Sequence, residues 1–307
     1  MSQPVIHLEQ LVKRYRRQVA LEGVSFEVPP GVVFALLGEN GAGKTTTIRI
    51  MLGLTEPDAG RAEVLGLDSR TKGQEVRRLV GYVPERPTLY EWMTVDEIGW
   101  FTAGFYGNGF LPSYRKLTDQ FELPAGRKIK ELSKGMRAKV VLSLSLAHEP
   151  ELLILDEPTS GLDTLVRREF LESMVDVAAT GRTVFLSSHQ ISEVERVADI
   201  VAILRQGKLV LMERLDELKD QIQELTITVQ DGTPRPPDLP CRVLSERQKD
   251  RQWQILVRGA TEQQLNTLRA QQSVREVESR SPSLEEIFVA YMRTSPEPAA
   301  QGASSHE

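Results

Sequence analysis

The sequence has a single cysteine, no long apolar run and no excess of positive charge. The one cysteine, Cys241, excludes an internal disulfide and a multi-cysteine metal site, and we expect it to be a small apolar residue. No apolar stretch approaches the roughly 20 residues that span a bilayer, and residues 1–7 lack the layout of a signal peptide. The net charge is −5, so we expect no nucleic-acid partner.

Short apolar runs alternate with helical patterns up to about residue 220, which predicts an α/β fold with a largely parallel sheet. The apolar runs 32–37, 152–155 and 183–186 are predicted strands, and each is followed by glycine or by polar residues. A helix is predicted over 45–52. Open α/β sheets bind ligands at the carboxyl edge of their strands, so we expect the site to lie there.

The pattern divides the chain into three parts. Residues 1–220 are predicted to form one domain, into which a helical subdomain of about residues 88–148 is inserted. Residues 221–293 are predicted to form a small α+β domain, and residues 294–307 a disordered tail. In the small domain, the pattern predicts strands at 225–229, 241–244, 253–257 and 274–279, and helices at 261–271 and 283–292.

A phosphate-binding loop follows the first predicted strand. It fits G-x-x-x-x-G-K-[ST] at every fixed position and consists of Gly38, Glu39, Asn40, Gly41, Ala42, Gly43, Lys44 and Thr45. Its glycines allow backbone N–H groups to surround phosphate oxygens, and the next helix adds its positive end. Lys44 can reach the β- and γ-phosphates, and the Thr45 hydroxyl can bind Mg²⁺.

Two acids end the second predicted strand. Asp156 stands where a magnesium-holding aspartate is expected, and Glu157 is placed to act as general base on the attacking water. On their own, two such acids would favour a solvated turn. With the phosphate-binding loop present, they favour a nucleoside triphosphatase with a P-loop core.

Further motifs resemble those of the ATP-binding-cassette (ABC) ATPases, in that family's order, from residue 5 to about 218. Leu132-Ser133-Lys134-Gly135-Met136 resembles the signature loop, and Ser160-Gly161-Leu162-Asp163 resembles the D-loop. Glu85 stands at the position of the Q-loop glutamine, and His189 resembles the switch histidine. Tyr15 stands where an aromatic residue stacks on adenine, although a packing tyrosine is an alternative.

The resemblance implies binding and hydrolysis of ATP with Mg²⁺. It implies catalytic roles for Glu157, His189 and Lys44, and Mg²⁺ contacts from Thr45, Glu85 and Asp156. The implied ATP-binding residues are Tyr15, residues 38–46 including Thr46, and Ser133, Gly135 and Asp163. The last three would face ATP held by a second cassette, so the resemblance implies a homodimer or heterodimer of cassettes. Alone, Ser133 and Gly135 would be only a good helix start.

Three positions depart from the family pattern: Glu85 replaces glutamine, Lys134 replaces glycine and Met136 replaces glutamine. These departures resemble the branch that serves ABC-2 type exporters, as does the ending Ser283-Leu284-Glu285-Glu286-Ile287-Phe288. Since the core acids, Lys44 and His189 are intact, we expect active hydrolysis.

The resemblance implies separate transmembrane permease subunits as partners and a peripheral place on the cytoplasmic face of the inner membrane. Tyr90, Trp92 and Leu89 are candidates for the contact with those subunits if they are exposed, and core residues if they are buried. One alternative is a soluble ABC-type ATPase of a non-transport machine. Such proteins usually carry two cassettes or a long coiled-coil insertion, and this sequence has neither. A degenerate, binding-only cassette disagrees with the intact acids.

Overall fold

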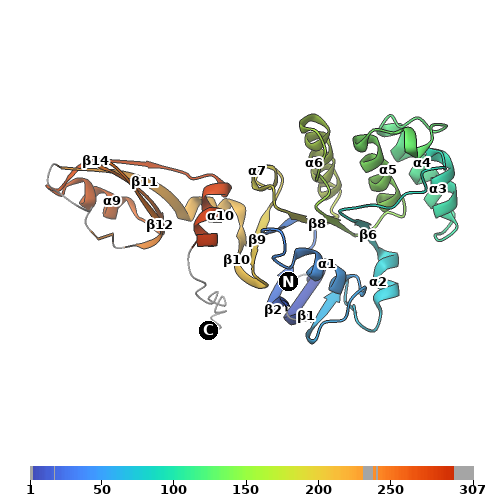
Figure 1. Ribbon diagram of the computed structural model, residues 1–307, viewed down its shortest axis with the longest axis horizontal. Helices are drawn as coiled ribbons and strands as arrows, with labels where there is room; N and C mark the ends of the chain where they lie inside the picture. The colour runs from blue at the N-terminus through green and yellow to red at the C-terminus, as the bar shows by residue number, and fades with distance from the viewer. Residues whose placement is uncertain (1–2, 17, 231–237, 240, 294–307) are drawn as a thin grey trace. The chain divides into compact units, whose positions relative to one another are not determined.

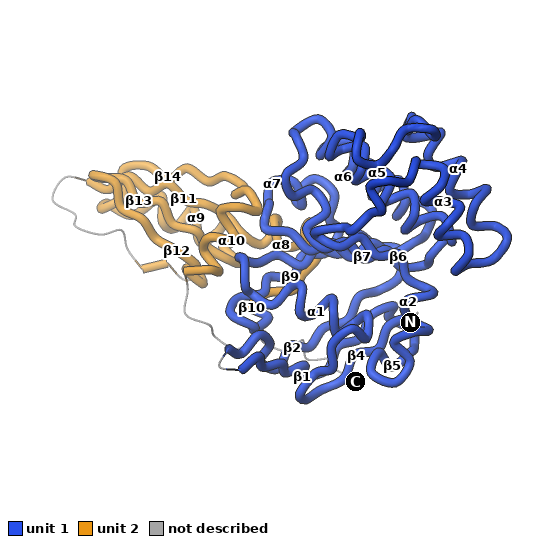
Figure 2. The backbone as a smooth tube through the Cα atoms, turned by 45° about the vertical axis from the view of Figure 1, so that its right-hand side comes forward, with its two compact units in different colours: residues 1–209 blue, residues 210–307 orange. Residues whose placement is uncertain are grey.

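The computed structural model describes residues 3–16, 18–230, 238–239 and 241–293. Its backbone contacts divide the chain into two compact units, residues 1–209 and 210–307 (Figure 2). The division lies eleven residues before the boundary predicted at 220, within the strand β10 (Lys208–Arg214). The predicted tail at 294–307 lies outside the described residues, as do residues 231–237 between two predicted strands.

The core of the first unit is a six-stranded sheet of order β10-β9-β3-β8-β7-β6. The pairs between β9, β3, β8, β7 and β6 are all parallel, as predicted. Their bounds are β3 Val33–Leu37, β6 Val80–Val83, β7 Leu152–Asp156, β8 Thr183–Ser188 and β9 Ile200–Arg205. Every residue of β3, β7 and β8 is buried, which explains why these strands have unbroken apolar runs.

Helices cover the parallel sheet on both sides. Figure 1 shows α1 (Lys44–Met51) on one side and α6 (Thr164–Ala179) on the other. The short helices α2 (Gly73–Leu79) and α7 (Ile191–Val194) follow β5 and β8 in the chain. The sheet and its helices therefore place the ends of β3, β7 and β8 side by side at one edge.

A second, antiparallel sheet belongs to the first unit, and the sequence analysis did not anticipate it. Its order is β2-β1-β4-β5, with bounds β1 Ile6–Tyr15, β2 Gln18–Val28, β4 Ala59–Val64 and β5 Leu67–Asp68. Three stacked rings join it to the parallel sheet, because Phe34 lies 5.3 Å from both Phe26 and Phe185 between ring centroids. The helix α1 contacts strands of both sheets.

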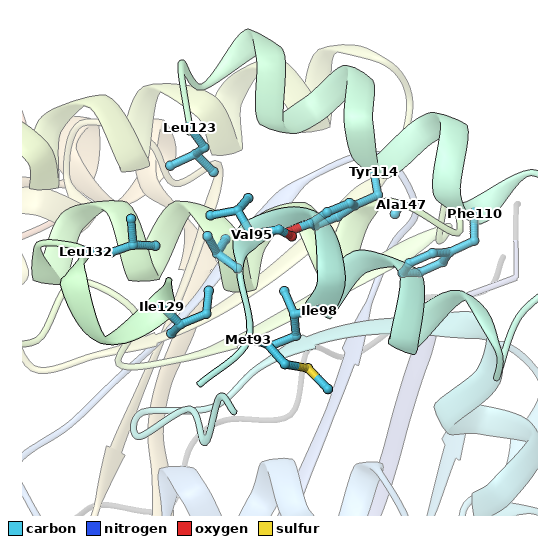
Figure 3. Close-up of a cluster of buried hydrophobic side chains, with 10 residues drawn as sticks. Met93, Val95, Ile98, Phe110, Tyr114, Leu123, Ile129, Leu132 and Ala147 are labelled. Atoms are coloured by element: carbon cyan, nitrogen blue, oxygen red, sulfur yellow. The ribbon is translucent and has the colours of Figure 1, made fainter. Parts of the chain in front are cut away.

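The predicted helical subdomain consists of α3 (Val95–Ala103), α4 (Phe110–Gln120), the 3-10 turn η1 (Ile129–Glu131) and α5 (Lys134–Leu146). A capping box starts α3, in which Thr94 and Glu97 satisfy each other's backbone N–H groups. The subdomain has its own apolar core, shown in Figure 3. At its centre, the fully buried Tyr114 donates a hydrogen bond to the carbonyl of Val95, at 2.8 Å.

The second unit contains a four-stranded antiparallel sheet of order β12-β13-β11-β14. Its elements are α8 Leu215–Gln221, β11 Ile222–Val229, β12 Arg242–Lys249, β13 Gln252–Arg258, α9 Glu262–Arg269, β14 Val274–Arg280 and α10 Leu284–Arg293. Each predicted strand and helix of this region is present. Apolar side chains of α9 pack on β11, β13 and β14.

The Ser-Leu-Glu-Glu motif has a local structural role at the start of α10. The Ser283 hydroxyl accepts from the Glu286 N–H at 3.3 Å, and the Glu286 carboxylate accepts from the Ser283 N–H at 2.8 Å. Arg280 pairs with the same carboxylate at 2.6 Å and lowers the pKa of Glu286 to about 2. The motif is therefore a capping box that starts the final described helix.

The packing of α3 against α4 makes a stability prediction. A Cβ at Gly99 would lie 2.1 Å from the Tyr114 ring, so Gly99→Ala forces the buried ring to move. We expect a loss of about 1–3 kcal/mol in the free energy of unfolding, measured by denaturant titration. Helix propensity alone predicts the opposite sign, a gain of about 1 kcal/mol. Gly126→Ala is the control, because nothing lies within 4 Å of its added Cβ.

Candidate active site

The phosphate-binding loop joins β3 to α1, as predicted. Gly41 and Gly43 have φ angles of 83° and 113°, in the region that favours glycine. A Cβ at Gly43 would also lie 2.5 Å from the carbonyl oxygen of Ala20, so no other residue fits there. Lys44, the first residue of α1, folds back over the loop and donates to the carbonyl of Gly38 at 2.7 Å. The loop therefore holds its lysine inside the turn.

Asp156 lies at the end of β7 and is almost completely buried. Its Oδ1 accepts hydrogen bonds from Ser187 at 2.6 Å and from Thr45 at 3.2 Å. Burial raises the pKa of Asp156, the nearby charges of Glu157 and Glu85 raise it further, and the two hydroxyl donors oppose them. A carboxylate beside the Thr45 hydroxyl provides the hard oxygen donors that Mg²⁺ prefers.

Glu157 links three strand ends. Its Oε1 lies 3.0 Å from Nζ of Lys44, and its Oε2 lies 2.7 Å from Nδ1 of His189. Its backbone has a φ of 50°, and its N–H is held by Ser187 on β8 at 3.1 Å. Because a buried carboxylate is costly without partners, the lysine and the histidine are what allow Glu157 to stay 8% exposed.

These groups line one cleft of about 540 Å³. The residues around it are Tyr15, Gln18, Ala20, Glu39, Asn40, Gly41, Gly43, Lys44, Thr45, Thr46, Glu85, Glu157, Ser160 and His189. Of the predicted site residues, the structure thus brings eleven together at the wall of the cleft. Gly38 and Ala42 belong to the loop but do not line the cleft, and Asp156 lies behind its wall, in contact with Thr45. Gln18 and Ala20 were not predicted, and Ser160 was named only as part of the D-loop, in which Asp163 was the predicted site residue.

Tyr15 and Glu85 stand at the open side of the cleft. Tyr15 is 43% exposed, and Nζ of Lys13 lies 5.5 Å from its ring centroid. The ring is therefore not a core residue, which disfavours the packing alternative. The Glu85 side chain is 44% exposed and contacts the Arg86 guanidinium at 3.8 Å. Its carboxylate is free enough of the core to turn toward a ligand.

Ser133, Gly135 and Asp163 do not line this cleft. Ser133 is the N-cap of α5 and accepts from Met136 N–H at 3.2 Å, and Asp163 is the N-cap of α6. A Cβ at Gly135 would lie 2.6 Å from a methyl group of Val166, so the two helices touch at their first turns. The three predicted residues therefore gather at a second place, the paired starts of α5 and α6.

An exposed aromatic surface lies on the helical subdomain, formed by the loop before α3, the second half of α3 and the residues just after it. It consists of Tyr90, Trp92, Trp100, Phe101 and Phe105, which are 36–72% exposed. The ring centroid of Tyr90 lies 6.2 Å from that of Trp92 and 5.4 Å from that of Phe101. The ring centroid of Phe101 lies 5.6 Å from that of Phe105. Tyr90 and Trp92 are thus exposed and not core residues, while Leu89 packs partly against the subdomain core.

Within the described ranges, no helix is both long enough and apolar enough to cross a membrane. Nor do three or more His, Cys, Asp or Glu side chains gather there into a metal-binding group.

Comparison with known proteins gives the family of each part. Residues 21–160 match the ABC transporter family model, and residues 214–292 match the C-terminal domain of DrrA1-3-like ATP-binding proteins. The "Nod factor export ATP-binding protein I" of Burkholderia pseudomallei (strain 1710b) is 36% identical over 70% of its length and 68% of this chain. The "Probable multidrug ABC transporter ATP-binding protein YbhF" of Escherichia coli K12 is 37% identical over 72% of this chain but only 39% of its own length.

A solved structure described as an "ATP binding subunit of ABC transporter" superposes with a TM-score of 0.64 and 34% identity, covering 70% of this chain and 92% of that one. The two proteins therefore share a fold over that part of this chain. With the loop, acids and histidine that line one cleft, these similarities show that the chain belongs to the ABC transporter family, as one of its ATP-binding and ATP-hydrolysing subunits.

Proposed function

We propose that the cleft holds ATP with Mg²⁺, that Glu157 is the general base, and that two such cassettes drive export by separate membrane subunits. The observation that carries this proposal is the contact of Glu157 with both Lys44 and His189 beside the phosphate-binding loop. A carboxylate, an ammonium group and an imidazole within one cleft suit the roles of base, cation and proton donor.

The loop and α1 bind the triphosphate. Backbone N–H groups of residues 39–46 and the positive end of α1 favour phosphate oxygens, and Lys44 adds a full charge. Lys44 already lies in the loop, 3.0 Å from Glu157. A γ-phosphate therefore competes with the Glu157 carboxylate for this ammonium group. Tyr15, exposed at the open side, stacks on the adenine.

Hydrolysis then uses Glu157 and His189. Glu157, once separated from Lys44, accepts a proton from the attacking water. His189 hydrogen-bonds the γ-phosphate and fixes the carboxylate that it already contacts at 2.7 Å. The burial of Glu157 keeps its carboxylate away from bulk water, which strengthens its interaction with the reacting water.

Thr45, Asp156 and Glu85 would hold Mg²⁺. When bound, the ion would neutralise negative charge on the phosphate oxygens while the γ-phosphoryl group is transferred to water. Thr45 and Asp156 lie together, 3.2 Å apart, and Glu85 is close enough to raise the pKa of Asp156. The carboxylate of Glu85 supplies an oxygen donor where the family has a glutamine.

A second cassette completes each site. Ser133, Gly135 and Asp163 lie together at the starts of α5 and α6, outside the cleft of their own chain. Helix starts favour anions, so Ser133 and Gly135 suit a γ-phosphate held by a partner cassette, identical or related, and Asp163 would link the two cassettes across the closed interface. Closure around two ATP molecules and reopening after hydrolysis would then move the membrane subunits.

The exposed aromatic surface supports the proposal of a membrane partner. Contiguous exposed aromatic side chains are uncommon on monomers and mark protein interfaces. A cassette bound in this way would lie peripherally on the cytoplasmic face of the inner membrane. Export as the direction is supported by the relatives named for Nod factor export and multidrug transport. The alternative of a soluble ABC-type machine leaves these aromatic side chains without a purpose.

The first test concerns the base. Glu157→Gln should lower the ATPase rate of the purified transporter about 100-fold or more, while ATP still binds. Glutamine keeps the size and loses the basic carboxylate. The rate is measured by phosphate release and binding by equilibrium dialysis. The exposed Glu75→Gln on α2 is the control. A Glu157→Gln transporter that hydrolyses ATP at the native rate rejects Glu157 as the base.

The second test uses the burial of Asp156. Its pKa is raised in the folded chain, so folding favours the protonated form, and stability is lost as pH rises from the ordinary aspartate pKa of 3.8 through the raised pKa. Asp156→Asn should therefore raise the Tm of the nucleotide-free chain at pH 8 more than at a pH at or below 3.8, while Mg²⁺-dependent ATPase is lost. A Tm difference that does not depend on pH contradicts this account.

The third test concerns the membrane partner. Replacing Trp92 and Phe105 by serine should leave the ATPase of the isolated chain within about twofold of native, since neither residue lines the cleft. The same change should prevent copurification with a protein that has several membrane-spanning helices. Leu54→Ser, also an exposed apolar position, is the control. Unchanged copurification would exclude the aromatic surface as the contact.

A further inference from the structure

The carboxylate of Glu193 contacts the loop that joins Glu157 to Asp163. Glu193, on α7, contacts Nη1 of Arg167 through Oε1 at 2.7 Å. Its Oε2 accepts a hydrogen bond from the Thr159 hydroxyl at 3.1 Å. Thr159 is buried, and the Glu193 side chain is only 15% exposed. Both oxygens of Glu193 are therefore used inside the fold.

Arg167 extends this contact to the other end of the loop. Its Nη2 donates to the carbonyl of Leu162 at 2.8 Å, one residue before Asp163. Arg167 itself lies in the first turn of α6. Through Thr159 and Arg167, Glu193 thus holds the loop near its beginning and near its end. We name these three residues the loop clamp: Thr159, Arg167 and Glu193.

The clamp also belongs to the segment that carries the histidine. Glu193 lies four residues after His189, on a helix of four residues, Ile191–Val194. His189 contacts Glu157, which lies two residues before Thr159. The contacts therefore close a ring, from Glu157 to Thr159, across to Glu193, back along the chain to His189 and across again to Glu157.

The local backbone explains why this closed set of contacts is needed. Glu157 and Gly161 both have positive φ, 50° and 72°, and the loop has turn hydrogen bonds, from Ser160 N–H to Glu157 and from Leu162 N–H to Thr159, but no helix or strand. A helix of a single turn is marginal without tertiary contacts. Neither segment is therefore fixed by regular structure, and the side chains of the clamp fix each against the other.

Resting on the function proposed above, we propose that Glu193 is a positioning residue for hydrolysis. It sets the position of the Glu157 carboxylate relative to His189, and through Arg167 it sets the position of Asp163. It does not line the ATP cleft. Instead it lines a separate groove of about 650 Å³ between α6 and α7. Its effect on the reaction therefore passes through Thr159 and Arg167.

The test is Glu193→Gln in the purified transporter. Glutamine has the size of glutamate but no charge for Arg167, so the clamp weakens while the groove stays filled. We expect kcat for ATP to fall between about 10-fold and 100-fold, because small displacements of a reacting group have effects of that size. The KM for ATP and the equilibrium binding of ATP should change less than about twofold, since no ATP-binding group is removed.

Glu172→Gln is the matched control. Glu172 lies in the same groove, on α6, and pairs with Arg168 at 2.7 Å, but neither touches the loop. Its loss should leave kcat unchanged. Thr159→Val is a second variant that removes only one hydroxyl contact, and it should lower kcat less than Glu193→Gln does. Because the two clamp partners act through one contact, Glu193→Gln and Arg167→Gln combined should be no worse than the worse single change.

The outcomes separate this proposal from the one on which it rests. If Glu157→Gln abolishes hydrolysis but Glu193→Gln matches the Glu172→Gln control, the clamp has no positioning role. A rise in KM with native kcat, or additive losses in the double variant, overturns it equally. If Glu157→Gln hydrolyses ATP normally, the assigned base is wrong and the clamp proposal falls with it. A fall in kcat with unchanged KM and with a Tm equal to that of the control supports the clamp.

Discussion

The contact between Glu157, Lys44 and His189 is the constraint on which the first unit depends. The three residues follow β7, β3 and β8, which are neighbours in the sheet. Two of them, Lys44 and Glu157, are buried charges that lie 3.0 Å apart, so each is tolerable only because of the other. The order of the strands therefore determines that these three side chains contact one another. A different strand order would leave an unpaired charge inside the protein.

The same contact explains how the nucleotide-free chain differs from one with ATP. Lys44 has a carboxylate partner in the structure, and a triphosphate offers it phosphate oxygens in exchange. The exchange leaves Glu157 with His189 as its remaining partner at 2.7 Å. In the proposed mechanism, this one ion pair stabilises both buried charges and frees Glu157 to act as the base once ATP binds.

Much of this arrangement follows from the sequence because it is encoded locally. The loop before Lys44, Glu157 after β7 and His189 after β8 are local signals at strand ends, and the structure brings them to one cleft. The strands of the second unit were predicted for the same reason. The signature serine also appears where a helix begins, as N-cap of α5. The roles of Ser133, Gly135 and Asp163 toward a partner cassette stay predictions.

Other features depend on contacts between distant residues. The antiparallel sheet was not anticipated, because β1 pairs with both β2 and β4 through irregular registers that break simple alternation. Gln18 and Ala20 reach the cleft only through that sheet. Glu193 and Arg167 look like ordinary surface charges in the sequence, and only the fold brings them 2.7 Å apart. The unit boundary falls inside β10, where no composition change marks it.

The close packing at Gly135 has a mechanical consequence. Val166 fills the space where a side chain would stand, so α5 and α6 begin as one rigid corner that carries Ser133 at one tip and Asp163 at the other. In the proposed pair of cassettes, Ser133 and Asp163 would therefore move away from the partner together, so that separation at one ATP would also displace the D-loop beside the second.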